Sequence, residues 1–374
     1  MNMLPKVCHV VLGLPSGGTE HLVYQMIQNP PRGFSASGLC LDDLGILGQE
    51  GVSRGMEIVC LGRKAGLDWT LAARIAGHAR RRNVRILHCH QYTPWFYGIL
   101  SKLLKPELKV VFTEHGRFYP DVVSWRRRCF NKVMGPLTDC ITGVSPATLK
   151  ALREVEGFNA SRMLLIYNGV DGSNFEALDN RTEIRSKLGL SPAWHYFILT
   201  CRLDPIKWID GLLQAFRLVV DRSPETGLLL IGDGHLRESI ASQIRQLGLQ
   251  DHVVMPGYQP NVAEWLKAAD VFVMSSLSEG TSVSLIESMA AGLPCVVTRV
   301  GGNEHVMQDG VTGVLVPPQS VEAMAEGMLR MIVDWDMRAR FGQNALKRFR
   351  EQFQLTAMLQ GYEKIYRSLL KLDS

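Results

Sequence analysis

The sequence lacks long apolar runs, and none approaches the roughly 18 residues that a membrane-spanning helix needs. One short apolar segment, Val7–Leu14, lies near the start, but little positive charge precedes it and Pro15–Gly18 follows. We therefore interpret this segment as a buried first strand that ends in a glycine turn, and not as a signal peptide. The composition, 46% hydrophobic and 21% charged, is typical of a soluble globular protein, and 374 residues suffice for about two domains.

The chain also has no C-x-x-C pair, a frequent spacing in zinc and redox sites. Its eight cysteines lie mostly in apolar, strand-like stretches, which predicts buried free thiols in a reducing cytosol. The segment His88-Cys89-His90 contains metal-binding residue types. Because side chains alternate between the two faces of a strand, these three cannot converge on one ion without help from elsewhere. We predict no metal site.

Complete phosphate-binding fingerprints are missing as well. The turn Gly13–Thr19 follows a predicted strand and opens a helix, but it has neither the lysine of a P-loop nor the glycine spacing of a dinucleotide site. The turn Gly232–Gly234 has no third glycine three positions later. These gaps argue against nicotinamide and flavin enzymes and against P-loop ATPases. A D-x-D sequence, Asp334–Asp336, lies within a helical stretch, and we interpret it as a junction between helices and not as a metal chelator.

Positive charge is concentrated in the first half. Residues 1–170 carry 21 Lys and Arg against 12 Asp and Glu, a balance of +9, whereas the remainder carries 20 against 24, a balance of −4. Two basic clusters, Arg80–Arg82 and Trp125–Arg128, indicate an anionic partner, either a membrane surface, a phosphorylated acceptor or nucleic acid. Solvated helix faces would carry the same clusters. Nucleic acid is the weakest of these options, because Trp125 is the one aromatic residue within the clusters.

Short β-branched runs alternate with amphipathic helical patterns, which predicts an α/β fold of parallel sheets with helices on both faces. The turn-rich segment Asn168–Gly172 separates two such series. We place one doubly wound domain at residues 1–169 and a second at 170–355, with a C-terminal helix, 356–374, that returns to the first. The expected strands are Val7–Leu12, Glu57–Leu61, Arg85–Leu87, Val110–Thr113, Cys140–Gly143 and Met163–Tyr167, then Tyr196–Cys201, Leu228–Ile231, His252–Met255, Val271–Met274 and Cys295–Thr298.

Two cations follow the first strand of the second series. Arg202 lies at the strand end, and Lys207 lies in the first turn of a helix for which Asp204 is the expected N-cap and Pro205 the first residue. Ligands of doubly wound sheets bind beyond the carboxyl ends of the strands, so both cations would face such a ligand. A guanidinium and an ammonium together suit a diphosphate. Alternatively, Arg202 pairs with Asp204 or another carboxylate, and Lys207 is merely solvated.

Two carboxylates, Glu279 and Glu287, stand eight positions apart across a loop that opens a helix. Free backbone N–H groups and the positive end of the helix dipole suit a phosphate or a polyhydroxylated ligand, and carboxylates accept hydrogen bonds from hydroxyl groups. The alternative is structural, since Ser284 and Glu287 have the S-x-x-E spacing of a capping box.

A histidine ends another predicted strand, within Thr113–Arg117. At that place His115 would be suited to hydrogen bonding or acid–base chemistry, although a lone histidine at a strand end is more often structural.

Together these segments resemble the retaining glycosyltransferases of family 4, whose GT-B fold has two Rossmann-like domains facing each other across a cleft. The resemblance covers nearly the whole chain and depends on the order and spacing of its parts. Two departures, Cys201 in place of a frequent glycine and Thr281 in place of a frequent aromatic residue, remove no charged group. The matching segments are Gly17–Glu20, Glu114–Gly116, Ile166–Asp171, Arg202 with Lys207, Ile231–Gly234, Pro256–Gly257, Glu279–Glu287, Ala291–Pro294 and Asp309–Gly313.

The resemblance implies transfer of a hexose-type sugar from a nucleoside diphosphate sugar, expected to be UDP-linked, with retention of configuration and without a metal ion or other cofactor. Arg202 and Lys207 would bind the diphosphate, Glu287 the ribose hydroxyls and Glu279 the sugar hydroxyls. His115 would lie over the transferred sugar. The further donor contacts would come from Gly17, Gly18, Gly280, Thr281 and Ser282. No covalent nucleophile is agreed for the family, so we expect displacement on the front face, with the leaving phosphate taking the acceptor's proton.

The acceptor is expected on the first domain, near Arg117, Tyr119 and Trp125–Arg128. Many relatives act on lipid-linked intermediates, so the resemblance implies polysaccharide or glycolipid synthesis by a cytoplasmic protein that docks peripherally on the inner face of an anionic membrane. A soluble small-molecule acceptor is the alternative. So is a non-catalytic sugar-nucleotide-binding subunit, an epimerase or a phosphorylase, although nothing marks the pyridoxal-phosphate lysine of the last.

Overall fold

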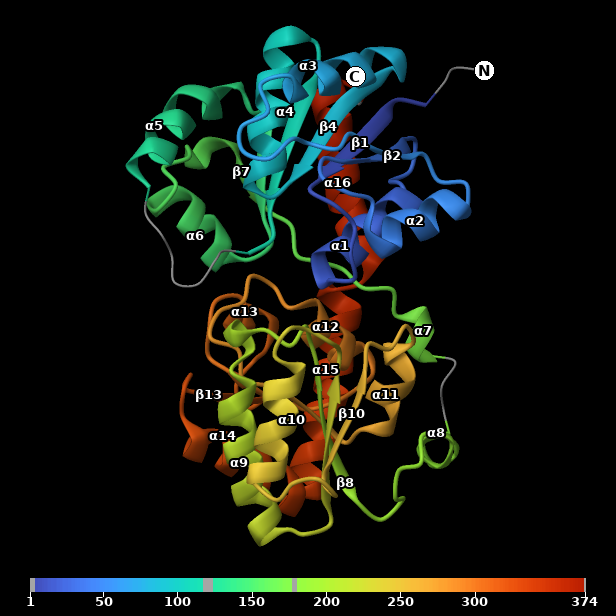
Figure 1. The fold of residues 1–374 in the computed structure, drawn as a ribbon, viewed down its shortest axis with the longest axis vertical. Coiled ribbons are helices and arrows are strands. Elements are labelled where there is room, and N and C mark those ends of the chain that lie inside the picture. The colour runs from blue at the N-terminus through green and yellow to red at the C-terminus, as the bar shows by residue number, and fades with distance from the viewer. Residues whose placement is uncertain (1–3, 117–123, 177–179, 373–374) are drawn as a thin grey trace. The chain divides into compact units, whose positions relative to one another are not determined.

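The computed structural model describes residues 4–116, 124–176 and 180–372. The chain divides into two compact units: residues 1–169 with 356–374, and residues 170–355. Each unit contains one parallel sheet with helices around it, so the predicted α/β class with two Rossmann-like sheets is confirmed (Figure 1).

The first unit has a seven-stranded sheet in the order β3-β2-β1-β4-β5-β6-β7. The strand order changes direction between β1 and β4, which is the switch point where doubly wound sheets bind ligands. The strands are β1 (Lys6–Val11), β2 (Ser35–Cys40), β3 (Ile58–Cys60), β4 (Val84–His90), β5 (Lys109–Glu114), β6 (Cys140–Gly143) and β7 (Met163–Leu165). The helices are α1 (Gly18–Gln28), α2 (Gly45–Ser53), α3 (Leu71–Arg81), α4 (Tyr92–Leu104), α5 (Trp125–Met134), η1 (Gly135–Leu137), α6 (Pro146–Glu154) and η2 (Ala160–Arg162).

The second unit has a six-stranded sheet in the order β10-β9-β8-β11-β12-β13, with its switch point between β8 and β11. The strands are β8 (His195–Thr200), β9 (Thr226–Ile231), β10 (Val253–Gly257), β11 (Val271–Met274), β12 (Cys295–Thr298) and β13 (Gly313–Val316). The helices are α7 (Ser173–Glu176), α8 (Arg181–Lys187), η3 (Pro205–Lys207), α9 (Ile209–Arg222), α10 (Arg237–Gln246), α11 (Val262–Ala268), α12 (Val283–Ala290), α13 (Asn303–Val306), α14 (Val321–Val333) and α15 (Trp335–Gln352).

The sequence analysis missed two strands and predicted a third strand too short. The strand β2 has no β-branched residue and therefore gave no signal. The strand β13 was missed although its four residues, Gly-Val-Leu-Val, are as apolar as those of predicted strands of the same length, such as β11. The predicted strand Arg85–Leu87 extends to His90, because its polar end pairs with β1 and β5 through the backbone. The D-x-D segment is a junction between helices, as predicted: Asp334 caps α15 by accepting a bond of 2.8 Å from the Met337 amide.

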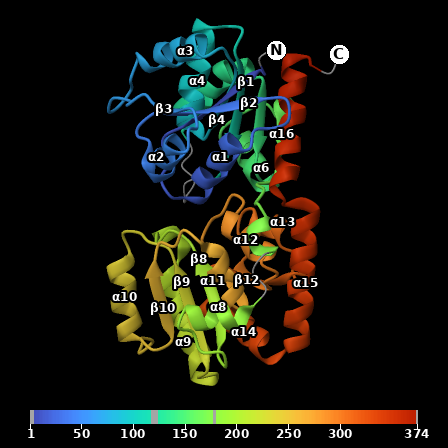
Figure 2. The same ribbon diagram turned by 90° about the vertical axis from the view of Figure 1, so that its right-hand side faces the viewer.

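The last helix, α16 (Leu355–Leu370), belongs to the first unit from Thr356 onward and lies along it (Figure 2). Two tyrosines from this helix are buried against strand residues. The Tyr366 hydroxyl lies 2.6 Å from His88 Nδ1, and the Tyr362 hydroxyl lies 3.2 Å from Thr113 Oγ1. These contacts tie the end of the chain to β4 and β5.

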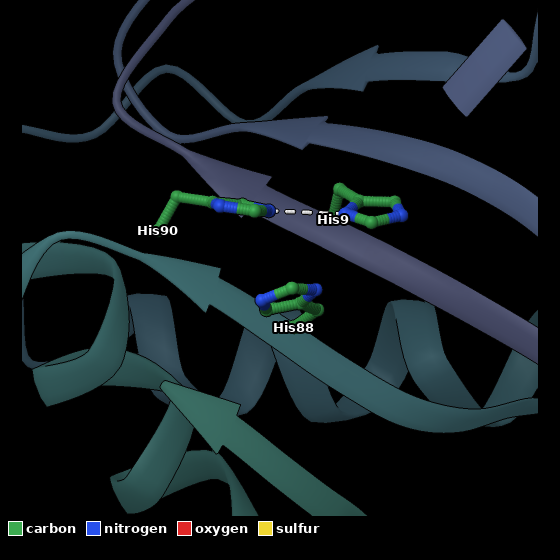
Figure 3. Close-up of side chains that lie close together, drawn as sticks. All are labelled: His9, His88 and His90. Carbon is green, nitrogen blue, oxygen red and sulfur yellow. Dashed lines mark hydrogen bonds between the residues drawn. The ribbon is translucent and has the colours of Figure 1, made fainter. Parts of the chain in front are cut away.

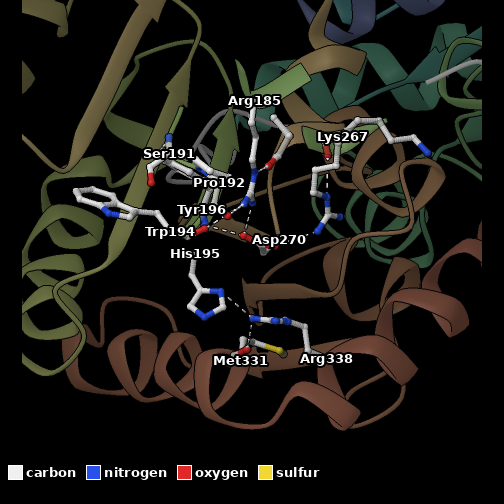
Figure 4. A network of polar contacts seen from close by, with 12 residues as sticks. Arg185, Ser191, Pro192, Trp194, His195, Tyr196, Lys267, Asp270, Met331 and Arg338 are labelled. Atoms are coloured by element: carbon white, nitrogen blue, oxygen red, sulfur yellow. Dashed lines mark hydrogen bonds and ion pairs between the residues drawn. The ribbon is translucent and has the colours of Figure 1, made fainter. Parts of the chain in front are cut away.

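A buried ion pair fixes the amino end of the second sheet, away from the strand ends where ligands bind (Figure 4). The Asp270 carboxylate accepts bonds of 2.7 Å from Arg185 Nη2 and 2.8 Å from the Tyr196 amide. The Arg185 guanidinium, only 5% exposed, also donates to the carbonyls of Ala268, Pro192 and Trp194. Because every group of the pair is hydrogen-bonded, its burial is tolerated, and it joins α8 to β8 and β11.

Candidate active site

A partly buried ion pair lies beyond the carboxyl ends of β8 and β11, at the switch point of the second sheet. Lys207 Nζ lies 2.6 Å from Glu279 Oε1, and the same oxygen accepts a bond of 2.6 Å from Ser276 Oγ. The two side chains are 20% and 10% exposed. Burial lowers the pKa of Lys207, but the charge of Glu279 and the hydrogen bond to it outweigh this effect, so the pKa is raised and the ammonium stays charged. The structure therefore brings these two predicted residues together.

The turn that carries Lys207 is held on both sides. Asp204 caps it by accepting a bond of 3.3 Å from the Ile206 amide, as predicted. The expected helix does start at Pro205, with a 3-10 turn; the α-helix begins at Ile209, after Trp208 in the left-handed conformation with φ of 47°. Two bonds tie the turn to the loop after β11: Ser275 Oγ donates to the Lys207 carbonyl at 2.7 Å, and the Leu277 amide donates to the Ile206 carbonyl at 2.8 Å.

Arg202 differs from Lys207 in its surroundings. Its guanidinium is 68% exposed and lies 3.3 Å from the Asp204 carboxylate. The alternative prediction for these cations is thus right for Arg202, which pairs with Asp204, and wrong for Lys207, which is not merely solvated. An exposed ion pair contributes little to stability, so Arg202 can exchange Asp204 for a more highly charged anion at small cost.

The loop Glu279–Ser282 is fixed by close backbone contacts with the turn after β12. Gly301 has φ of 51°, and a Cβ atom there would lie 1.9 Å from the Glu279 carbonyl oxygen, so only glycine fits. The Gly302 amide donates to the same oxygen at 3.1 Å. Thr281 and Ser282 are buried, and Gly280 is partly exposed. The three predicted residues 280–282 therefore lie directly between Glu279 and the start of α12.

The proposed capping box at Ser284 and Glu287 is wrong. The N-cap of α12 is Ser282, whose hydroxyl accepts a bond from the Leu285 amide at 3.4 Å, so Glu287 is the fifth residue of the helix and lies too far along it to cap. The Glu287 carboxyl is partly buried and has no ion-pair partner among the residues that the structure describes. Burial raises the pKa of Glu287 to about 7. Such a carboxyl gains from hydroxyl donors that stabilise its charge.

Three further predicted residues lie in the first unit. Gly17 is the N-cap of α1 and Gly18 is the first residue of that helix, directly after the first strand's turn. His115 follows β5 and is buried, with Nε2 2.9 Å from Nδ1 of His90. Burial lowers the pKa of His115 to about 4, although the Asn168 side chain counteracts part of this effect, so the imidazole is neutral at pH 7.

A cavity of about 220 Å³ at the switch point of the first sheet was missed by the sequence analysis. The residue after β4, Gln91, has φ of 71°, which is uncommon outside glycine and marks local strain at the cavity wall. Apolar groups supply most of the cavity surface, and acidic and polar side chains line the rest; of these, Asp42 is paired with Arg63 at 2.6 Å. The lining residues are Val11, Leu12, Gly13, Pro15, Thr19, Glu20, Asp42, Asp43, His90 and Gln91.

A group of buried histidines was missed as well (Figure 3). The alternation argument is right for Cys89, which packs in the apolar core, but His88 and His90 share the opposite face of β4. The parallel pairing of β1 and β4 sets His9 beside His88. Nitrogen atoms of these three residues lie within 4.8 Å of one another, close enough to hold a metal ion. His9 therefore supplies, from a second strand, the further ligand that a metal site at His88 and His90 would need.

The residues expected near the acceptor are only partly described. Arg117 and Tyr119 lie outside the described residues. Within Trp125–Arg128, Arg127 is used internally: it lies 2.8 Å from Glu156 Oε1 and stacks on the Tyr92 ring at 3.7 Å. Trp125, in contrast, is 70% exposed at the start of α5.

Comparisons with known proteins cover both units. The family model of glycosyl transferases group 1 matches residues 180–348, and that of Glycosyltransferase Family 4 matches residues 16–173. N-acetyl-alpha-D-glucosaminyl L-malate synthase of Bacillus anthracis is 30% identical over 312 residues, which cover 82% of this chain and 80% of the relative. The lipopolysaccharide core biosynthesis mannosyltransferase LpsB of Rhizobium meliloti is 25% identical over 299 residues, 78% of this chain and 81% of the relative.

Solved structures show the same fold. Alr3699/HepE of Anabaena, solved in complex with UDP, has a TM-score of 0.84 over 97% of this chain and 100% of that chain, at 19% identity. Sucrose-phosphate synthase of Thermosynechococcus elongatus has a TM-score of 0.81 over 98% of this chain and 100% of that chain, at 20% identity. With matching family models on both units and a relative at 30% identity along most of its length, this chain belongs to glycosyltransferase family 4 and has the GT-B fold.

Proposed function

We propose that this glycosyltransferase moves a hexose-type sugar from UDP to an acceptor hydroxyl with retention of configuration and without a metal ion. The ion pair of Lys207 and Glu279 at the β8–β11 switch point is the observation that supports this proposal most directly. It sets a cation for a diphosphate, on the η3 turn, beside an acceptor for sugar hydroxyls in the loop after β11. The second unit is proposed to hold the donor and the first unit the acceptor.

The bonding capacity of the pair fits both tasks. An ammonium has three N–H donors, and Lys207 uses one on Glu279, so two remain for phosphate oxygens. Glu279 Oε1 accepts from both Lys207 and Ser276, which leaves Oε2 for a sugar hydroxyl. Arg202 would exchange Asp204 for the diphosphate and neutralise the leaving group together with Lys207. These two cations supply the charge stabilisation from the chain itself.

The other predicted residues take roles that the family resemblance implies. Glu287 is proposed to accept bonds from the ribose hydroxyls, and the backbone N–H groups of Gly280, Thr281 and Ser282 to support the sugar. Gly17 and Gly18 are proposed to contact the donor, and neutral His115 to hydrogen-bond the transferred sugar. The leaving phosphate oxygen would take the proton of the attacking hydroxyl on the same face of the sugar. Trapping a glycosyl adduct on any side chain would refute this front-face displacement.

The test is transfer or hydrolysis of a panel of UDP-sugars by the purified chain and by Lys207→Ala and Glu279→Ala. Loss of one charge-stabilising donor typically lowers turnover by about 10²–10³-fold, and we expect that loss in Lys207→Ala. Glu279→Ala removes the acceptor for the sugar hydroxyl and the ion-pair partner of Lys207, so we expect it to lower turnover as well. Lys187→Ala is the matched control, because Lys187 also forms an ion pair, with Glu264 at 2.9 Å, but is 64% exposed on the outer surface of α8. UDP binding without turnover in the unmodified chain would favour a non-catalytic subunit. Activity that persists after exhaustive chelation supports the metal-free mechanism, and its loss would contradict it.

For the acceptor, we propose a polyhydroxylated group bound in the cavity at the β1–β4 switch point. Carboxylates and amides accept and donate the hydrogen bonds that hydroxyl groups need, and Glu20, Asp43 and Gln91 line this cavity. An anionic acceptor such as a dicarboxylate would meet negative charge there. Transfer to neutral glycoside acceptors that falls in Asp43→Ala, with donor hydrolysis unchanged, would support this placement. Equal activity of the variant would refute it.

We further propose that the acceptor is lipid-linked and that α5 docks on an anionic membrane surface. The exposed face of α5 combines apolar and basic side chains: Trp125 and Val133 are 70% and 72% exposed, and Arg126 and Lys132 are exposed beside them. Each basic residue near an anionic surface contributes about 1 kcal/mol. No helix among the described residues is long and apolar enough to cross a membrane. Sedimentation with anionic vesicles should be salt-sensitive and weaker for Trp125→Ser; equal recovery on neutral vesicles would defeat the idea.

A soluble small-molecule acceptor is the second candidate, favoured by the Bacillus anthracis relative, whose name contains L-malate as part of the product. Transfer assays with L-malate and with a short-chain lipid-linked sugar discriminate the two. Product formed from malate, and none from the lipid-linked sugar, would replace the membrane proposal.

A further inference from the structure

A groove of about 390 Å³ lies on the first unit, between α6 and the segment that leads into β7. Because β7 is the last strand of its sheet and pairs only with β6, no strand lies beyond it among the described residues. Four lining residues, spaced i, i+3, i+4 and i+7, form one stripe along α6, and the other two come from η2 and β7. The lining residues are Pro146, Leu149, Lys150, Arg153, Ala160 and Met163. We call this feature the α6 groove.

Apolar and basic side chains line the α6 groove together. Leu149 and Met163 are partly buried and pack against the apolar core of the first unit. A hydrocarbon chain gains free energy when it covers such apolar surface, and the flexible methionine side chain can adapt its shape to the chain. The lining also contains two cations, Lys150 and Arg153, and no carboxylate. The groove therefore combines the two kinds of contact that an anionic amphiphile needs.

Both cations of the α6 groove are available to an anion. Arg153 Nη2 lies 2.7 Å from Glu154 Oε1, and the two side chains are 58% and 47% exposed. Such an exposed pair contributes little to stability, so Arg153 can turn to a more highly charged anion at small cost. Lys150 has no ion-pair partner among the described residues. It lies close to the pair, since the hydrogen bond from Arg153 lowers the pKa of the Glu154 carboxyl and the charge of Lys150 adds to this effect.

The surroundings of the groove are basic as well. Arg162, on η2, donates to the carbonyls of Pro136 and Thr138, and Arg128, on α5, donates to the Glu154 carbonyl at 3.3 Å. Neither guanidinium forms an ion pair within the part of the chain that the structure describes. The summed positive charge attracts an anion to this side of the first unit.

We propose that the α6 groove binds the alkyl phosphate part of a lipid-linked acceptor. A free phosphate would leave the apolar lining uncovered, and a neutral hydrocarbon chain would leave the cations unused. A phosphate joined to an alkyl chain uses both, with its oxygens on Lys150 and Arg153. The inference rests on the proposed function, in which the acceptor is lipid-linked, and it adds the residues that hold the lipid part.

The position of the groove in the sheet fits this role. The groove begins at Pro146, the first residue of α6, which follows the carboxyl end of β6. That is the edge at which doubly wound sheets bind their ligands. The strand β6 stands two strands from β4, which is about 10 Å along the sheet. A lipid phosphate in the groove would therefore leave its sugar within reach of the cavity at the β1–β4 switch point.

Methyl NMR tests the site directly, with dodecyl phosphate below its micelle-forming concentration as the probe. In the full chain labelled on the methionine methyl groups, we expect the Met163 signal, assigned by Met163→Leu, to shift on titration. The signal of Met274, which is buried in the second unit, should stay in place. Loss of one hydrogen bond to a charged group lowers affinity by about 10-fold or more, and we expect that loss in Lys150→Gln. Lys364→Gln is the matched control, because Lys364 is an exposed lysine of the same unit on α16. Dodecyl maltoside and inorganic phosphate, which each lack one half of the ligand, should bind more weakly than dodecyl phosphate.

Transfer assays distinguish a lipid-linked acceptor from a phospholipid of the bilayer, which has the same chemistry. With a short-chain lipid-linked sugar and a soluble glycoside as acceptors, the preference for the lipid-linked one is the ratio of the two kcat/KM values. Lys150→Gln should lower this preference by about 10-fold. Ala160→Glu, which adds a carboxylate to the groove at an exposed position, should lower it too.

Three results would overturn the proposal: equal binding of dodecyl phosphate by Lys150→Gln and the unmodified chain, equal binding of dodecyl maltoside, or equal binding of inorganic phosphate. An unchanged acceptor preference in Lys150→Gln, despite weaker binding of dodecyl phosphate, would assign the groove to a bilayer phospholipid and refute its role for the acceptor. If the unmodified chain transfers no sugar, the proposed function fails, and the NMR titration still decides whether the groove binds an alkyl phosphate.

Discussion

The raised pKa of Glu287 gives a prediction that can be worked out in numbers. Burial raises its pKa from 4.5 to about 7, and a tenfold change in proton affinity corresponds to about 1.4 kcal/mol. Between these two pH values the folded state holds a proton that the unfolded state has lost. Stability therefore falls as the pH rises through this window, and the loss reaches about 3 kcal/mol above pH 7. Below pH 4.5 this carboxyl contributes no such loss.

Glu287→Gln removes the charge and keeps the shape of the side chain. We expect the variant to be more stable than the unmodified chain by up to about 3 kcal/mol at pH 8.5 and by little at pH 5. A stabilisation of about 3 kcal/mol should raise the melting temperature of the unit formed by residues 170–355 by about 6–12 °C, as measured by calorimetry. Glu351→Gln is the control, since Glu351 is exposed near the end of α15. A difference that does not change with pH would refute the reasoning.

The pH dependence of UDP binding is a second test of Glu287. If ribose hydroxyls donate to Glu287, UDP favours the ionised carboxylate, and its binding releases a proton below pH 7. The affinity of the unmodified chain for UDP should then rise with pH up to about 7 and level off above it. In Glu287→Gln the pH dependence that comes from this carboxyl should vanish. The pH dependence that comes from the UDP phosphate is the same in both proteins. The ratio of the UDP affinity of the unmodified chain to that of the variant therefore reports on Glu287 alone. A ratio that is constant from pH 5.5 to 8 would contradict the ribose contact.

Three further predictions follow from packing and exposure. Asp270→Ala leaves a buried arginine without its carboxylate and should lower the free energy of unfolding by about 3–5 kcal/mol in urea titrations; an unchanged midpoint would show that the pair is not structural. Gly232→Ala places a Cβ atom 1.9 Å from the carbonyl oxygen of Cys201 and should cost at least about 2 kcal/mol by calorimetry, more than Gly248→Ala, which also has positive φ but open space. Cys129 is the exposed thiol among the eight, so it should react first with a thiol reagent, and Cys129→Ser should remove that fast phase.

Much of the fold could be predicted because the signals are local. Buried parallel strands are continuous apolar runs, and the predicted bounds of Cys140–Gly143, Val271–Met274 and Cys295–Thr298 are those of β6, β11 and β12. The alternation of such runs with amphipathic helices is enough to predict doubly wound sheets. The strand β2 was missed because Ser35–Cys40 forms a strand through its neighbours' backbones and not through its own side chains.

The approach of Lys207 to Glu279 was foreseeable from one rule, that residues after neighbouring parallel strands meet at the same edge. The rule does not say which cation pairs with which carboxylate. Lys207 is partly buried against Glu279, just before Trp208 turns the chain through a left-handed conformation, whereas Arg202 stays exposed beside Asp204. No local pattern marks a tryptophan for that conformation, so only the structure separates the two cations.

The buried histidines His9, His88 and His90 show a second limit, which is strand register. Alternation along β4 fixes that His88 and His90 share a face, but the partner strand and its offset decide what stands beside them. A shift of β1 by one residue would turn His9 to the other face of the sheet and would replace it with an apolar neighbour from the sequence Val7–Val11. Contacts between residues 81 positions apart follow from strand order and register, which the sequence of neither strand encodes alone.

Strain occurs at the switch points of both sheets. Among the described residues other than glycine, positive φ occurs at five positions, and two of these follow the strands that border a switch point: Gln91 after β4, and Trp208 in the segment after β8. Such a conformation costs about 1–3 kcal/mol and persists only where surrounding contacts enforce it. Gln91 is held by a bond of 2.8 Å to the Thr113 carbonyl, and the Trp208 turn by the loop after β11. In each unit the strained residue adjoins a residue of a proposed binding site, His90 in the wall of the first cavity and Lys207 in the second unit. Hydrogen bonds to the neighbouring strands and loops compensate for this conformational strain. They hold a polar side chain in one orientation at the edge of the sheet where ligands bind.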